Sequence, residues 1–496
     1  MADITVGKAV PEDQQLKKGA LTTWDALALS IAVIAPAMAA AYNTSFAASV
    51  SGGSTPLGFL IAGLSSLALA YVVIQFTRRM ASAGYAYTYT TKALGPTIGF
   101  LVGWLYTFGF ALFVPMTMAG ASGNLSTLLA SSFGWNINWF IFFIAGMVGI
   151  FLLSYYGVRL STRTQLILGA ASVLVVGLVA VIIIVKGGAS GNDVSAFGWG
   201  HTTSGSGAFN GISLGIVYAI TSFIGFETSA VLGEETANPR RSIPLSIIGA
   251  VIFAVVFYLV ITYAMSIGYG VNNGAKWGAD FTPLHTLANR YASSLTVLVD
   301  LAAIVSAYIV CLACHTATVR VMFSMGRDGA LPRALGRTHP VHKTPVNAIV
   351  VNIAFATIVA MVLGFPTVAG WAGSGSGLVY GFCGGMGSIA VAAVYVVLCI
   401  SGIVYFRRVM GGEYSVIKHV VVPVIGMIAF TLGIWGAISG SPAVPFNSMA
   451  PITGLWILLG VGLVFYLHSR SPELVRTLGQ VMGEEGGSGE GEAELA

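Results

Sequence analysis

The chain has 496 residues, of which 56% are hydrophobic and only 8% are charged. Soluble domains carry about 25% charged residues, so this composition excludes an ordinary soluble fold and favours a protein that lies mostly in lipid. The formal net charge is +5, but the basic residues are spread over short loops, so we expect no nucleic-acid partner.

Twelve apolar runs are long enough to cross a bilayer as helices, which takes about 20 residues each. The predicted spans are Thr23–Val50, Leu57–Thr77, Thr97–Leu129, Trp139–Tyr156, Gln165–Lys186, Phe209–Leu232, Ile243–Gly268, Leu295–Met325, Val346–Leu363, Phe382–Phe406, Val420–Ser439 and Ile452–His468. Only the connections 187–207 and 269–294 are long, and both fall on one side. Within the second, Thr282–Tyr291 predicts a short amphipathic helix. The sequence therefore predicts an all-α membrane protein of about 12 transmembrane helices.

Basic residues are distributed unevenly between the two sides of this topology. Of the 23 lysines and arginines, 20 fall on one side, and only Lys186, Lys276 and Arg290 fall on the other. The positive-inside rule assigns the basic side to the cytoplasm. We therefore expect a multi-pass protein of the cell (inner) membrane with residues 1–20 as a cytoplasmic N-terminal segment. Residues 21–470 form a single transmembrane domain, and residues 471–496 form a cytoplasmic disordered acidic tail.

The first predicted span contains a proline among small residues. Pro36 lacks the N–H that a helix interior needs and clashes with the preceding turn, so we expect the helix to break there. Small side chains would let a substrate approach the backbone, although a tightly packed, proline-kinked helix is the alternative. The candidate substrate-binding residues of this break are Ala35, Pro36, Ala37, Met38, Ala39 and Ala40.

The sixth predicted span combines a glycine, a carboxylate and hydroxyls at mid-membrane depth. Irregular backbone survives in a bilayer only where it is buried in protein or lines a water-filled cavity. The candidate substrate-binding residues of this second break are Ser222, Phe223, Gly225, Phe226 and Glu227. Because the first and sixth spans stand five apart, they match a design of two inverted five-helix halves with broken helices. Repeat one is then expected over about 22–187, repeat two over about 208–408, and two added helices over about 418–468.

Two carboxyl groups, Glu227 and Asp300, fall inside apolar runs. An ionisable group at this depth is costly unless it is paired, protonated or hydrated, so it predicts function. Glu227 has three candidate roles: attracting a substrate ammonium, carrying a coupling proton, or bonding the frayed backbone of the first helix. Asp300, near the outer end of the eighth span, is a second coupling candidate, with a hydrated interfacial position as the alternative.

His315, deep in the eighth span, is a further coupling candidate, although a hydrogen-bonded core histidine is the more common case. No lysine or arginine lies at mid-membrane in this topology. A neutral to negative site favours a cationic or zwitterionic substrate. Cys311 and Cys314 have C-x-x-C spacing, but they lie in one apolar helix without a second pair. We therefore expect no metal, no cofactor and no enzymatic activity.

Three ordered blocks of the sequence resemble a known transporter superfamily. The first is Gly225-Phe226-Glu227 with Gly233-Glu234-Glu235, Asn238-Pro239, Arg241 and Ile243-Pro244; the second is Ala83-Gly84-Tyr85-Ala86-Tyr87-Thr88-Tyr89 with Gly99-Phe100 and Gly103-Trp104; the third is Met325-Gly326-Arg327-Asp328-Gly329-Ala330-Leu331-Pro332 with Thr344-Pro345. Together they resemble the amino acid–polyamine–organocation superfamily over roughly residues 19–468. This resemblance implies a five-plus-five inverted repeat with two added helices, and alternating access around a midplane site.

The chain departs from the superfamily at two places. Its amino acid carriers usually have a glycine-rich first break, where this chain has Ala35 and Pro36. Putrescine importers of the superfamily are similar there and share a histidine matching His315, but their nearby aspartate falls at Ala41. A fifth-helix lysine that serves as coupling cation in some members is replaced by Ser172, which we expect to be a candidate ligand for sodium.

The resemblance also suggests gates on both sides of the site. Phe223 or Phe226 is expected to be the aromatic gate, and Thr221 stands where some antiporters place a tryptophan. The inner-gate candidates are Glu234, Glu235, Arg241, Arg327 and Asp328, which could form ion pairs that break and re-form during transport; simple solvated loop charge is the alternative.

The sequence therefore predicts a secondary active transporter that imports an amino acid, a biogenic amine or a polyamine, with H+ as the favoured coupling ion. An exchanger or a Na+-coupled symporter is the alternative within this class. An ion channel is the alternative of a different class, and it would need repeated polar positions on several helices.

Overall fold

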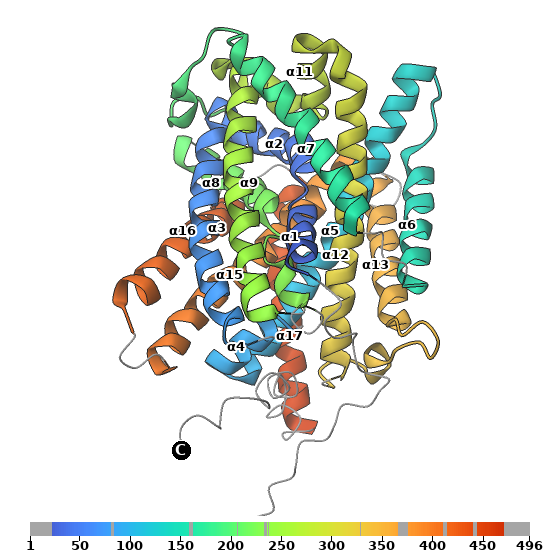
Figure 1. The fold of residues 1–496 in the computed structure, drawn as a ribbon, viewed down its shortest axis with the longest axis vertical. Helices are drawn as coiled ribbons and strands as arrows, with labels where there is room; N and C mark the ends of the chain where they lie inside the picture. The colour runs from blue at the N-terminus through green and yellow to red at the C-terminus, as the bar shows by residue number, and fades with distance from the viewer. Residues whose placement is uncertain are drawn as a thin grey trace, which may run out of the picture.

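The computed structural model describes residues 22–470 except 81–83, 158–161, 206, 233–235, 237, 328, 366–374, 410–413 and 440–443. These residues form one bundle in which every long element is a helix (Figure 1). The predicted all-α membrane fold is confirmed. The predicted tail at 471–496 and the N-terminal segment at 1–20 lie outside the described residues.

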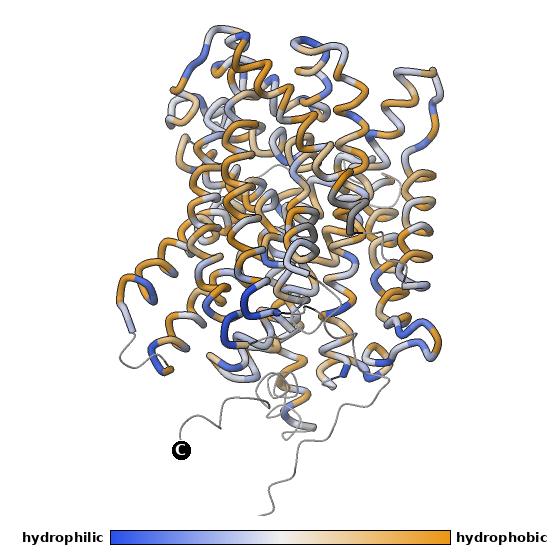
Figure 2. The backbone as a smooth tube through the Cα atoms, in the orientation of Figure 1, coloured by the Kyte–Doolittle hydropathy of each residue, from blue (hydrophilic) through white to orange (hydrophobic). Residues whose placement is uncertain are grey.

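Within the described residues, twelve crossings follow one another. They are α1 with α2 (Thr23–Ile34 and Pro36–Ser51), α3 (Thr55–Thr77), α5 (Pro96–Phe133), α6 (Trp139–Tyr155), α7 (Thr162–Val185), α8 with η4 (Ala208–Phe223 and Thr228–Leu232), α9 (Pro239–Tyr269), α12 (Thr296–Arg327), α13 (Val346–Gly364), α15 (Ser376–Val409), α16 (Val422–Ser439) and α17 (Met449–Arg470). In the described part of the chain, nine helical stretches are long and apolar enough to cross a membrane, and α6 and α8 are shorter apolar helices. Hydrophobic residues follow the middle of the bundle, and hydrophilic stretches gather at its two ends (Figure 2).

Short helices precede the third crossing of each half, at opposite ends of the bundle. The helix α4 (Ala86–Leu94) leads into α5, and α11 (Pro283–Tyr291) leads into α12. Figure 1 shows α4 at the bottom and α11 at the top. Two halves that place corresponding helices on opposite sides have inverted topology. The short helix expected at Thr282–Tyr291 is confirmed as α11.

Glycines allow the central helices to pack closely. A Cβ on Gly109 of α5 would lie 2.6 Å from the Val391 side chain of α15, and a Cβ on Gly387 would lie 2.6 Å from Phe113. Membrane helices gain contact mainly through such small residues because lipid offers no hydrophobic driving force. These approaches fix α5 and α15 as adjacent walls around the centre of the bundle.

The two long connections meet at the end of the bundle that carries α11, as predicted. The ring of His201 lies 2.9 Å from Asn272 Oδ1 and so joins the connection after α7 to the one after α9. In α10 (Gly274–Ala279), a Cβ on Gly278 would lie 2.3 Å from the Ser49 Cα at the end of α2. This end, called the outer end below, is therefore covered by α10 and α11.

Candidate functional site

The first crossing is broken at the predicted place. Ala35 has φ 49° and ψ 61°, in the left-handed region, which costs an L-residue about 1–2 kcal/mol. Pro36 is the first residue of α2, a position where its missing N–H costs little. The proline therefore ends one helix and starts another, in place of kinking a continuous one.

The break exposes unpaired helix ends to the interior. The first-turn N–H groups of Ala37 and Met38 have no carbonyl within α2 to accept them, and Met38 N–H donates to Ser306 Oγ of α12 at 3.4 Å. The last carbonyl of α1, at Ile34, accepts from the Tyr258 hydroxyl of α9 at 2.9 Å. Side chains of two other helices thus hold the break in place.

The sixth crossing is also broken. The helix α8 ends at Phe223, Gly225 has φ 113°, and the short helix η4 follows. Gly225 N–H donates to Glu227 Oε2 at 3.0 Å, and the Gly225 carbonyl accepts from Thr228 N–H and Oγ1–H. Of the roles proposed for Glu227, the bond to the first helix is therefore corrected, because the carboxylate binds the backbone of its own break.

The two breaks lie side by side at the middle of the bundle. Asn43 of α2 donates to Ser222 Oγ of α8 at 2.9 Å, and Ser229 N–H donates to Ser30 Oγ of α1 at 3.3 Å. Both pairs join the first crossing to the sixth, once on each side of the breaks. The candidate residues at the two breaks are buried, so they enclose one interior region.

Glu227 belongs to a cluster with three tyrosines. Its side chain is completely buried, and Oε1 accepts from the Tyr395 hydroxyl of α15 at 2.5 Å. The rings of Tyr85 and Tyr106 lie against each other at a centroid distance of 5.6 Å, and among the described residues their buried hydroxyls have no hydrogen-bond partner. Sequence reasoning missed Tyr106 and Tyr395, whose one signal is a hydroxyl inside an apolar run.

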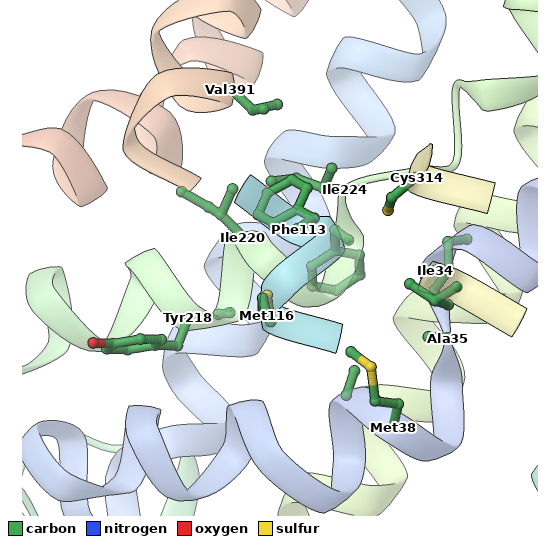
Figure 3. Close-up of a cluster of buried hydrophobic side chains, with 14 of the residues drawn as sticks. Ile34, Ala35, Met38, Phe113, Met116, Tyr218, Ile220, Ile224, Cys314 and Val391 are labelled. Atoms are coloured by element: carbon green, nitrogen blue, oxygen red, sulfur yellow. The ribbon is translucent and has the colours of Figure 1, made fainter. Parts of the chain in front are cut away.

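Apolar side chains line the other side of the breaks. Figure 3 shows them converging from the first, third, sixth, eighth and tenth crossings. The labelled residues are Ile34, Ala35, Met38, Phe113, Met116, Tyr218, Ile220, Ile224, Cys314 and Val391. A ligand held between the breaks would therefore meet polar backbone at one end and an apolar wall along its body.

The aromatic-gate candidates point in different directions. Phe223 packs on Phe59 and Tyr258, at ring-centroid distances of 6.4 and 5.3 Å, and so faces α3 and α9. Phe226 lies 6.3 Å from the Tyr395 ring, beside the carboxylate cluster. Thr221 bonds to Ser388 of α15 and to the Val217 carbonyl. Of the two phenylalanines, Phe226 is therefore the one beside Glu227.

The three other coupling candidates are dispersed. Ser172 is buried, and its hydroxyl donates to the Leu168 carbonyl of its own helix at 2.8 Å. His315 is paired with Asn352 of α13 at 2.9 Å. It follows Ser306 by nine residues, or about 900° of helix rotation, so it lies on the opposite face of α12 from the first break.

Asp300 is a buried carboxylate near the start of α12. Its side chain is 6% exposed, and Oδ2 lies 2.8 Å from His285 Nδ1 of α11, the helix that covers the outer end. The alternative of a hydrated interfacial position does not match this burial, and the role of Asp300 in coupling stays a prediction.

The inner-gate candidates are only partly described. Arg241 is exposed near the start of α9, and Arg327 ends α12 with its guanidinium 5.7 Å from the Phe323 ring centroid. Glu234, Glu235 and Asp328 lie outside the described residues. Among the residues the structure describes, no group of three His, Cys, Asp or Glu side chains could hold a metal ion.

The helix ends give the breaks a defined electrostatic character. The N-terminus of α2 carries partial positive charge, and the C-termini of α1 and α8 carry partial negative charge. Free N–H groups at a helix N-terminus bind carboxylates, and helix C-terminal carbonyls accept from ammonium groups. The polarity of these helix ends therefore suits an amino group, a carboxylate or both.

Comparison with known proteins finds an amino acid permease family and several transporters. Residues 21–466 match the amino acid permease family. The branched-chain amino acid permease BcaP of Lactococcus lactis subsp. cremoris is 24% identical over 91% of this chain and 94% of its own length. The low-affinity putrescine importer PlaP of Escherichia coli is 26% identical over 62% of this chain and 67% of its own length.

A further relative and a solved structure extend the match. The methylthioribose transporter of Bacillus subtilis is 24% identical over 86% of this chain and 88% of its length. The manganese transporter of Eremococcus coleocola superposes with a TM-score of 0.56 over 95% of this chain and 99% of its own, at 13% identity. At that identity the likeness concerns the fold alone.

Proposed function

Because the chain belongs to the amino acid permease family, we propose that it is a secondary active transporter that imports an amino acid or a biogenic amine by alternating access. The observation that carries this proposal is the junction of the two helix breaks, bonded by Asn43–Ser222 and Ser30–Ser229. Unwound backbone is tolerated inside a bilayer only where it is buried in protein or lines a water-filled cavity. A site for a polar substrate meets this condition.

The substrate class follows from the two walls of the junction. The helix ends suit an amino group, with or without a carboxylate, and the apolar side chains around Met38 and Ile224 suit an aliphatic or aromatic body (Figure 3). Relatives named for branched-chain amino acids and for putrescine both fit this description. We propose that the carboxylate of Glu227, in the second break, attracts the amino group of the substrate.

Proton coupling is our favoured energy source. Glu227 is the carboxyl group of the described helix breaks and can carry one proton through the cycle, whereas Ser172 offers sodium one hydroxyl that already donates to Leu168. Release of the Glu227–Tyr395 bond would remove one of the bonds between α15 and the sixth crossing, another being Thr221–Ser388, so protonation and opening would be linked. Arg241 and Arg327, with Glu234, Glu235 and Asp328, are our candidates for ion pairs further inside.

The test is uptake into liposomes of purified protein. A thermal-shift panel of amino acids and polyamines first identifies ligands, since a ligand at 100 times its Kd stabilises the folded state by about 2.7 kcal/mol. We expect the labelled ligand to accumulate under an inward proton gradient and not without one. Accumulation driven by sodium alone would redirect the coupling, and passive ion conductance without uptake would indicate a channel.

Glu227→Gln tests the proposed role of the carboxylate. The amide keeps the shape and can still accept from the Gly225 N–H through its oxygen, but its NH2 group cannot accept from the Tyr395 hydroxyl and the charge is removed. A hydrogen bond to a charged group is worth about 1.5–3 kcal/mol, so we expect uptake to fall about tenfold or more while the protein stays folded in detergent. Wild-type transport by this variant would eliminate Glu227 from both substrate binding and coupling.

A further inference from the structure

The structure describes a second buried carboxylate, Asp300, which the transport cycle outlined above does not use. It lies in the second turn of α12 at the outer end, away from both breaks. We propose that Asp300 is an outer receiving site for the ammonium group of the substrate, and that His285 occupies this site while the outer end is closed. The inference rests on the proposed function, because it requires an amine-bearing substrate.

The partner of Asp300 is a side chain that can leave. His285 Nδ1 lies 2.8 Å from the carboxylate, and His285 is 37% exposed while Asp300 is 6% exposed. The His285 ring therefore covers the carboxylate and shields it from solvent, while the outer edge of the ring is itself exposed to solvent. A substrate ammonium donates to a carboxylate with the same geometry as an N–H of the ring and brings a permanent charge.

Two of the three permanent cations of the outer end, Lys186 and Arg290, have other partners, and the third, Lys276, is exposed in α10. Lys186 Nζ donates to the Tyr291 carbonyl at 2.7 Å. The Arg290 guanidinium donates to the Gly268 carbonyl at 3.3 Å and stacks 5.3 Å from the Tyr291 ring centroid. The only described salt-bridge geometry at Asp300 is thus with His285, so the carboxylate lacks the fixed cation that a purely structural buried acid usually has.

The helix that carries Asp300 is bonded to the first break. Met38 N–H, in the first turn of α2, donates to Ser306 Oγ of α12 at 3.4 Å. Ser306 lies six residues after Asp300 on the same helix. The helix α12 thus connects the outer carboxylate to the helix whose first turn forms the first break.

A single face of α12 runs from Asp300 toward the breaks. Residues three or four apart share a helix face, and this spacing relates Asp300 to Ala303, Ala307, Cys311 and Cys314, all of which are buried and small. Figure 3 shows Cys314 in the same cluster as Ile34 and Ile224 of the two breaks. The fourteen-residue separation corresponds to about 21 Å along the helix, so Asp300 and the breaks lie at different depths along one face of α12.

The helix α11, which carries His285, also covers the outer end together with α10. Phe281, at the turn between α10 and α11, packs 6.2 Å from the Phe46 ring of α2. Lifting α10 and α11 would withdraw His285 from Asp300 and uncover the same region in one motion. Opening would therefore create the amine site at the moment when the substrate can enter.

The test compares three variants by initial rates of uptake. We expect Asp300→Asn to raise KM for the amine substrate about tenfold, the equivalent of about 1.4 kcal/mol, with kcat within about twofold. His285→Ala keeps the Asp300 carboxylate and removes the imidazole that covers it, so the KM of this variant should not rise. Asp280→Asn is the matched control, because this neighbouring outer carboxylate is already bonded to Tyr269 at 2.6 Å and to Thr282 N–H at 2.8 Å.

The outcomes separate a receiving site from a latch. If Asp300→Asn and His285→Ala change KM equally, the pair only holds the outer end closed and the inference is overturned; an unchanged KM in Asp300→Asn also overturns it. If Asp300→Asn does not fold, Asp300→Glu restores the charge and must keep KM within about threefold, equivalent to about 0.7 kcal/mol. Wild-type protein that transports no amine or amino acid refutes the proposed function itself.

Discussion

At the residue scale, the polar groups of this protein are concentrated where helices are interrupted or meet. Glu227 accepts from the Gly225 N–H of its own break and from the Tyr395 hydroxyl of α15, while the buried hydroxyls of Tyr85 and Tyr106 have no hydrogen-bond partner in the described part of the chain. Buried polar groups without partners are costly. Hydroxyls that stay unpaired around a carboxylate therefore favour a place where a proton, a water molecule or a substrate amine completes the set.

Asn43 is the residue whose loss should disturb the junction most directly. It accepts from the Tyr380 hydroxyl at 2.7 Å and donates to Ser222 at 2.9 Å, so it joins three crossings. Asn43→Ala leaves the buried Tyr380 hydroxyl without its acceptor and removes the donor to Ser222, which keeps its bond to the Tyr218 carbonyl. We expect the variant to cost about 1–3 kcal/mol, measured as a lower Tm in detergent. Ser45→Ala is the control: the Ser45 hydroxyl is buried and has no hydrogen-bond partner among the residues the structure describes, so its removal should leave Tm unchanged or raise it. An equal loss in both variants would contradict this account of Asn43.

At the element scale, the two broken crossings are built differently. The first breaks at an alanine in the left-handed conformation followed by a proline, and α2 resumes as a full helix. The sixth breaks at a glycine, and only the five-residue η4 follows among the described residues. The first break therefore presents a helix N-terminus, whereas the second presents a helix C-terminus and a carboxylate, which gives the junction opposite charges on its two sides.

Gly225→Ala should disrupt the second break. At φ 113° an added Cβ is strained, and such conformations cost about 1–3 kcal/mol in non-glycine residues. We expect a lower Tm and loss of ligand-induced stabilisation in the thermal-shift assay. Gly169→Ala in α7 is the matched control, because a Cβ there meets nothing within 4 Å and alanine favours helix by about 1 kcal/mol. A Gly225→Ala protein that binds ligand normally would show that the turn need not be glycine.

At the scale of the whole molecule, the two ends of the bundle differ in charge and in closure. The outer end carries α10 and α11, packed on the end of α2, and contains Lys186 and Arg290. The opposite end carries α4, which the Arg408 guanidinium of α15 joins through the Ala93 carbonyl at 3.3 Å, together with most other basic residues. By the positive-inside rule we propose that this second end, with both termini, faces the cytoplasm.

This orientation can be tested by cysteine labelling in intact cells. Ser190 in the connection after α7 and Arg337 in the connection after α12 are exposed at opposite ends. A membrane-impermeant maleimide should label Ser190→Cys in intact cells and Arg337→Cys only after permeabilisation. The four native cysteines are buried, so the wild-type chain provides a low background. The reverse labelling pattern would invert the assignment of the outer end.

The crossings, and the places where two of them break, could be predicted from local features of the sequence. Apolar length, loop charge and the unusual residues Pro36 and Gly225 are local features, because a bilayer requires each segment to satisfy its own backbone. The ends differ by a few residues: α9 begins at Pro239, not at Ile243, and α15 begins at Ser376, not at Phe382. Both helices therefore begin a few residues before the start that hydropathy alone predicted.

Only the tertiary structure decided which candidate side chains share a site. Glu227 and Tyr395 lie 168 residues apart in sequence, and no local pattern joins them. His315 and Asp300 share one helix, yet one faces α13 and the other bonds α11. A helix turns 100° per residue, so hydropathy locates a residue in depth but leaves the direction of its side chain to packing. Contacts between distant segments are a property of the assembled bundle, and these contacts define the binding region.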